Sequence, residues 1–164
     1  MQKQLPLALV ESTKNLFATM LNSPVTFGAP AMCEHPACHD VSAIISYSGD
    51  ISGSVVLGLS SAAAVHIASK LAGVELEPDS ADLADAVGEV INMIAGGAKA
   101  RLNGRSISMS CPSVIHAPGH LVRSPGTLGC INVPCKTGEL TFSLYCIFQG
   151  VAAMAQPKAP VKAA

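Results

Sequence analysis

Apolar residues recur along the chain with two different periods, and each change of period marks an expected element. Helical spacing predicts a first helix over Leu5–Asn22, which Pro24 ends. Strict alternation of apolar and polar residues over Val41–Ser48 and again over Ile51–Leu59 predicts two antiparallel strands joined by a tight turn. The first third of the chain therefore combines one helix with one β-hairpin.

Two further helices, an interrupted strand and a second hairpin are expected after this point. Ser60-Ser61 and Gly73 are typical cap residues for the two ends of the first of these helices, and Asp79-Ser80 is typical for the start of the second. In chain order we expect a loop over Pro30–Asp40, helices over Ala62–Leu71 and Ser80–Asn103, a strand over Ile107–Ala117 interrupted at Pro112, a loop over Pro118–Gly129, and strands over Leu128–Pro134 and Leu140–Gln149.

This order of elements predicts an α+β fold in which the helices pack on a largely antiparallel sheet as a two-layer sandwich. No shift in composition divides the chain, so we expect one domain over residues 1–151. The low-complexity residues 152–164 are expected to form a flexible C-terminal tail.

The long helix over Ser80–Asn103 carries a narrow polar stripe. At about 100° per residue the stripe spans roughly 80° and holds Asp85, Glu89, Asn92, Gly96 and Lys99. The opposite side is apolar and is expected to face the core; it holds Leu83, Val87, Val90, Ile91, Ile94, Ala98 and Leu102.

Polar residues are ordinary on a solvated helix face, and Gly96 and Gly97 are also typical of close helix packing. However, Asn and Gly are poor helix formers, and a smooth spot at Gly96 beside the Asn92 carboxamide lets a second surface approach. A carboxamide orients a water molecule without a charge. With Glu89 one turn away to hold a cation, the stripe suits hydrolysis of a phosphoryl group carried by a partner protein.

Composition narrows the function classes. Only 13% of residues are charged, the formal net charge is −1, and aromatic residues make up 4%, so binding to nucleic acid through phosphate neutralisation or base stacking is disfavoured. Two long uncharged stretches, Ile51–Ser69 and Leu140–Pro157, are too polar or too interrupted for a membrane span. We therefore expect a cytoplasmic protein that binds neither membrane nor nucleic acid.

The pattern Asp85-x-x-x-Glu89-x-x-Asn92-x-x-x-Gly96, set in DAVGEVINMIAGGAKARL, resembles the helix motif of the CheX/CheC/FliY family of chemotaxis phosphatases. The single copy is similar to CheX, since CheC normally carries two. The similarity extends over about residues 5–150, with a hairpin before the helix and strands after it.

The resemblance implies a CheC-like fold and dephosphorylation of a CheY-like response regulator. The phosphorylated regulator would hold the Mg²⁺, so this chain needs no cofactor of its own. Asn92 would align the attacking water in the partner's site, Glu89 would pair with a lysine of the regulator, and Asp85, Gly96 and Lys99 would contact the partner. The resemblance also implies a homodimer. The alternative is a non-catalytic CheX-like dimer that binds receiver domains.

Cysteine and histidine residues suggest competing chemistry. Cys33, His35, Cys38 and His39 are zinc-ligand types within seven residues, but their spacing does not match the usual zinc patterns, so we predict no metal site. A chain of this size needs no disulfides, and we expect its six cysteines to be reduced. No G-x-S-x-G element accompanies the histidines, which argues against a serine hydrolase.

Overall fold

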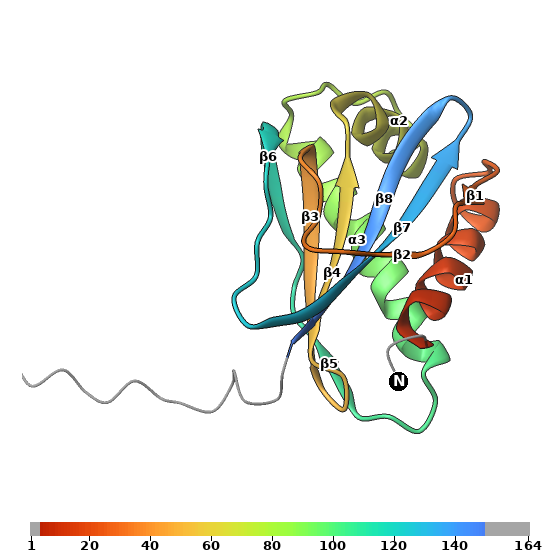
Figure 1. The fold of residues 1–164 in the computed structure, drawn as a ribbon. Coiled ribbons are helices and arrows are strands. Elements are labelled where there is room, and N and C mark those ends of the chain that lie inside the picture. The colour runs from red at the N-terminus through yellow and green to blue at the C-terminus, as the bar shows by residue number, and fades with distance from the viewer. Residues whose placement is uncertain (1–3, 150–164) are drawn as a thin grey trace, which may run out of the picture.

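Alternating apolar positions build one antiparallel sheet, in which the hairpin strands lie near the centre. The computed structural model describes residues 4–149, which form three helices and eight strands (Figure 1). The strands are β1 (Thr26–Phe27), β2 (Ala31–Cys33), β3 (His39–Gly49), β4 (Gly53–Leu59), β5 (Ile107–Met109), β6 (Ser113–His120), β7 (Thr127–Thr137) and β8 (Leu140–Gln149).

The sheet has the order β1-β7-β8-β4-β3-β5, with β2 also paired to β7 and β6 also paired to β3. The predicted hairpin is confirmed as β3 and β4, whose register places Ile45 opposite Val55. Every residue of β4 is buried, because this strand has neighbours on both edges and is covered on both faces. The hairpin of β7 and β8 is also confirmed, with Val133 opposite Leu144.

Three helices cover one face of the sheet (Figure 1): α1 (Gln4–Thr19), α2 (Ser61–Ala72) and α3 (Ala81–Arg101). The predicted caps are present, since Ser60 Oγ accepts from Ala63 N at 3.2 Å and Gly73 ends α2 with a φ of 72°. Helices and sheet enclose the main hydrophobic core, which confirms the two-layer α+β prediction. None of these helices, within residues 4–149, is long and apolar enough to cross a membrane.

The segment from Thr26 to Asp40, here called the strap, crosses the face of the sheet that the helices leave open (Figure 1). The prediction of a loop over Pro30–Asp40 is partly wrong, because β2 and the first residues of β3 lie within it. The backbone there pairs with a neighbouring strand over only a few residues, too few to produce a periodic pattern.

The second predicted loop, Pro118–Gly129, is also partly wrong. Strand β6 continues to His120 and pairs with β3 across an irregularity between His39 and Val41. Strand β7 begins at Thr127. Pro118 and Gly119, whose φ is 64°, are typical turn residues, yet the strand continues through them.

A small second cluster of apolar residues packs beneath the strap. Its buried members are Val56, Cys130, Tyr145 and Ile147, and partly buried Cys33, Ile44 and Val122 pack against them. The strap thus gives the sheet a limited second core on the face opposite the helices. The predicted tail, 152–164, lies outside the described residues.

Candidate functional site

Helix α3 presents the predicted polar stripe because its start and its packed side are both fixed locally. Ser80 is the N-cap, and its Oγ accepts from Leu83 N at 3.1 Å. Asp82 in the first turn and Lys99 in the last turn complement the helix dipole. Local interactions therefore fix where the helix begins, and its buried apolar side sets which residues face outward.

The two sides of α3 differ in exposure as the periodicity predicted. Asp85, Glu89 and Lys99 are exposed, and Asn92 and Gly96 are half-buried. The residues predicted to face the core are all buried, from Leu83 through Ala98, and Leu102 just beyond the helix is 7% exposed. The stripe is thus on the surface of the described chain, open to a second molecule.

Glu89 and Asn92 lie side by side at the middle of this stripe. Asn92 Nδ2 donates to Glu89 Oε2 across 3.4 Å, which is long for a hydrogen bond. A bond of this length costs little to give up, so both side chains are available to other partners. A carboxylate and a carboxamide are therefore presented together on one exposed turn.

Contacts beneath the stripe fix the backbone that carries these side chains. Tyr47 on β3 is buried, and its hydroxyl donates to Ala95 O at 2.7 Å. Burial raises the pKa of Tyr47, with a smaller contribution from nearby Cys146, so the hydroxyl keeps the proton that it donates. At Gly88 an added Cβ would lie 3.6 Å from both Pro112 and Val114, which is ordinary van der Waals contact, so the helix also packs on the start of β6.

Gly96 and Gly97 have opposite surroundings. A Cβ added at Gly97 would overlap Ser12 Oγ on α1, so this glycine permits the close approach of the two helices. A Cβ added at Gly96 would meet no atom of the described residues within 4 Å. Internal packing therefore accounts for Gly97 but not for Gly96, which leaves a smooth spot one turn after Asn92.

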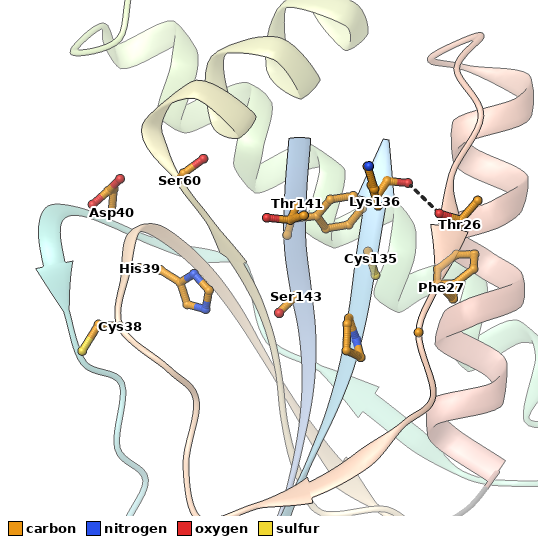
Figure 2. Close-up of a pocket in the computed structure, with 13 residues that line it drawn as sticks. Thr26, Phe27, Cys38, His39, Asp40, Ser60, Cys135, Lys136, Thr141 and Ser143 are labelled. Atoms are coloured by element: carbon orange, nitrogen blue, oxygen red, sulfur yellow. Dashed lines mark hydrogen bonds between the residues drawn. The ribbon is translucent and has the colours of Figure 1, made fainter. Parts of the chain in front are cut away.

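The candidate zinc ligands of the strap point to separate partners. His35 Nδ1 donates to Pro36 O at 2.8 Å, and His39 Nε2 lies 2.9 Å from the hydroxyl of Tyr145. Cys38 and His39 point in different directions (Figure 2). Among residues 4–149, no three His, Cys, Asp or Glu side chains come together in an arrangement that would hold a metal ion.

A cleft on the strap side was not predicted from the sequence. It has a volume of about 560 Å³ and lies between the strap and the ends of β7 and β8, with His39, Asp40 and Ser143 among its lining residues (Figure 2). Asp40 accepts from Ser61 N at 3.0 Å and from Gly119 N at 3.2 Å, and these bonds lower its pKa. In this cleft Asp40 thus serves to join the strap to α2 and β6.

Tyr145 connects the strap to the sheet. Ala37 N donates to the Tyr145 oxygen at 3.3 Å, which leaves the Tyr145 hydroxyl proton for His39 Nε2. Burial lowers the pKa of His39 below its ordinary 6.5; His120 lowers it further, and Asp40 opposes the shift. No local pattern signals this cluster, because the residues that form it are more than 100 positions apart.

Comparison with known proteins identifies a family and solved structures that are similar to this chain. The family model described as chemotaxis phosphatase CheX matches residues 41–136. The chemotaxis protein CheX from Desulfovibrio desulfuricans is 30% identical, with 87% of this chain and 98% of that chain covered and a TM-score of 0.78. A CheC-like superfamily protein from Shewanella sp. PV-4 is 28% identical, with 92% and 100% covered and a TM-score of 0.80.

A structure from Borrelia burgdorferi, of a CheX–CheY complex with BeF₃ and Mg²⁺, shares the fold at a TM-score of 0.74. Its identity to this chain is 19%, over 88% of this chain and 97% of that chain. No curated protein gives a significant match. The arrangement of three helices on one antiparallel sheet is thus common to this chain and to solved chemotaxis proteins.

Proposed function

The chain belongs to the CheX family of chemotaxis phosphatases, and from this premise we propose that it hydrolyses the aspartyl phosphate of a CheY-like response regulator. The observation that carries the proposal is the pair of exposed Glu89 and half-buried Asn92 on the surface of α3, in contact with each other and outside the core. The Borrelia burgdorferi CheX, solved in complex with CheY, supports a partner of this class.

In the proposed step Asn92 enters the partner's active site and holds a water in line with the phosphorus atom. The carboxamide oxygen of Asn92 accepts a hydrogen bond from the water, while the carboxamide NH₂ group donates hydrogen bonds to the phosphoryl oxygens. The bond from the water oxygen to phosphorus forms and the bond from phosphorus to the aspartyl oxygen breaks. The aspartate leaves as a carboxylate, and the proton of the water passes to the released phosphate.

The other residues of the stripe set the position of the partner. Glu89, freed from its long bond to Asn92, pairs with a lysine of the regulator. Gly96 lets the regulator approach closely, and Asp85 and Lys99 contact it at the two ends of the stripe. Phosphoryl transfer depends mainly on positioning and electrostatics, so a surface without a nucleophile of its own suffices.

The Mg²⁺ of the reaction belongs to the regulator in this proposal. The Borrelia burgdorferi complex contains Mg²⁺ together with CheY, which supports that assignment. The ion neutralises charge on the phosphoryl oxygens within the partner. This chain contributes the carboxamide, the carboxylate and the fixed helix that carries them, in the cytoplasm where such regulators act.

The test is the decay of a phosphorylated regulator in Mg²⁺ buffer, measured with and without this protein. The regulator is phosphorylated with acetyl phosphate, the donor is removed, and released phosphate is followed with time. We expect the wild type to accelerate release and Asn92→Ala to reduce that acceleration by about 10²-fold or more, the scale of losing one preorganised polar contact.

Asn103→Ala is the matched control, since Asn103 is an exposed amide just beyond the end of α3, outside the stripe. It should behave as wild type. If Asn92→Ala released phosphate at the wild-type rate, the proposed chemistry would be wrong. If wild type bound the regulator tightly without accelerating release, the chain would be a non-catalytic receiver-binding module.

We also propose that the chain forms a homodimer through the outer edge of β6. In the described part of the chain β6 pairs with β3 alone, which leaves its other edge unpaired. Ile115 on β6 is 39% exposed and Leu121 just after it is 41% exposed, so apolar surface lies along this edge. Ile115→Lys should shift the protein to monomer in sedimentation analysis while leaving its circular dichroism unchanged.

A further inference from the structure

Two thiols face each other beneath the strap. The antiparallel register of β2 and β7 places Cys33 directly opposite Cys130, and Cys33 packs against the buried cluster that contains Cys130. Cys33 is half-buried and Cys130 is buried. The pair belongs to the small apolar cluster on the face opposite the helices.

The backbone at this point suits a disulfide. Directly opposite residues of an antiparallel pair have Cα atoms about 4.5–5.5 Å apart, which lies inside the range of about 4.4–6.8 Å found for disulfides. Strand β2 has three residues and pairs with β7 alone among the described strands, so it can adjust without disturbing the rest of the sheet.

The surroundings distinguish this pair from the other cysteines. Cys135 and Cys146 are buried in the core on the helix side, and Cys38 and Cys111 are exposed. Cys130 also lines a cavity of about 320 Å³ whose wall includes His35 and Arg123. A small oxidant can therefore reach the pair from the half-buried side at Cys33 or through this cavity.

Arg123 and His35 are joined at the wall of this cavity. Arg123 Nη2 donates to His35 Nε2 at 3.3 Å, so a guanidinium is held at this side of the strap.

We propose that Cys33 and Cys130 form a reversible, oxidation-dependent disulfide that fastens the strap to β7. A hydroperoxide first oxidises the Cys33 thiol to a sulfenic acid and is itself reduced to an alcohol or, for hydrogen peroxide, to water. The Cys130 sulfur then attacks the Cys33 sulfur, the S–S bond forms, and the sulfenic oxygen leaves as water. A dithiol reductant reverses the change by thiol–disulfide exchange.

The order of the two steps follows from burial. Cys33 is the more accessible thiol, so it meets the oxidant first. Burial, together with the neighbouring Cys33 and Cys146 thiols, raises the pKa of Cys130, so its attack is slow near neutral pH and becomes faster as the pH rises. The yield of disulfide in a fixed time should therefore increase from pH 7 to pH 9.

The test is peptide mapping of the full-length protein after treatment with hydrogen peroxide and alkylation of the remaining thiols. Trypsin and Glu-C together separate Cys33 from Cys38, because cleavage follows Glu34, and release Cys130 with Cys135 on residues 124–136. Fragment ions then assign the linked sulfur. We expect a peptide linking Cys33 to Cys130, formed within one molecule and lost after dithiothreitol.

Two variants make the result decisive. Cys33→Ser should abolish the link, whereas Cys38→Ser, which removes an exposed thiol of the same strap, should leave it intact. The oxidised wild type should also melt several degrees higher than the reduced form, a shift absent in Cys33→Ser. The proposal is overturned if peroxide oxidises Cys38 and Cys111 while Cys33 and Cys130 both remain alkylatable, or if cross-links form only between molecules.

Discussion

Two adjacent glycines on α3, Gly96 and Gly97, allow the proposed contact with the regulator to be tested separately from packing inside the protein. Gly96→Ala adds a methyl group in open space, and Gly97→Ala adds one that overlaps Ser12 Oγ. The two substitutions are chemically identical and one residue apart. They should therefore share the gain in helix propensity and differ only in what the methyl group meets.

The expected magnitudes follow from these surroundings. Replacing an interior helix glycine by alanine gains about 0.5–1 kcal/mol, which for a chain of this size raises the melting temperature by roughly 1–4 °C. Gly97→Ala gains the same but adds an overpacking cost of about 1–3 kcal/mol against buried Ser12. The net result should be a fall of several degrees, and the double variant Ser12→Ala with Gly97→Ala should recover most of it.

For binding of the regulator, Gly96 and not Gly97 should be the sensitive position. Gly96→Leu places a larger side chain at the proposed contact, so the regulator should bind at least about tenfold more weakly, while the free protein is no less stable than wild type. Calorimetric melting and titration with the regulator measure the two quantities separately. The docking role of Gly96 is refuted if Gly96→Leu binds the regulator and accelerates dephosphorylation as wild type does.

Three further outcomes are expected. Glu89→Ala should weaken regulator binding by roughly tenfold, and Glu89→Gln should do so nearly as much because it removes the charge that pairs with lysine; titration at 50 and 500 mM salt should show the wild-type advantage shrinking. Tyr47→Phe removes the buried bond to Ala95 O and should cost about 1–1.5 kcal/mol in urea unfolding; an unchanged midpoint would contradict the proposed anchoring. Because the pKa of His39 is lowered in the folded protein, its contribution to stability is present above about pH 6.5 and is lost as the pH falls through that value towards the folded pKa; His39→Gln should flatten that decline.

The helices and the central strands could be predicted because their periodicity is local. Ser60 and Ser80 mark helix starts through hydrogen bonds to residues three positions on, and alternation over β3 and β4 directly reflects which side chains face the core. The same reasoning placed the stripe of α3 on the surface, since a buried apolar arc fixes the direction of the opposite arc. A site carried on one helix is therefore accessible to sequence reasoning.

The strap and its contacts could not be predicted, because they depend on residues that are far apart in the sequence. The bonds of Tyr145 to Ala37 and His39 span more than 100 residues, and nothing near Tyr145 in the sequence indicates them. Gly58 shows the same limit: an added Cβ there would overlap the ring of His39, a contact that no local pattern around Gly58 indicates. The pairing of Cys33 with Cys130 is likewise a property of register alone.

The way α3 is held explains how a surface with few functional groups can serve catalysis. An amide that orients water is useful only if the backbone that carries it does not move when the partner binds. Positioning accelerates a reaction because the freedom of the reacting groups is lost before the chemical step. Tyr47 fixes α3 from the sheet, and Gly97 lets α1 close on one flank. The only glycine of the helix that packs against nothing among the described residues is Gly96, next to the pair that must meet the partner. The contacts that fix the helix therefore lie beneath the stripe, and the glycine that leaves room for a partner lies on it.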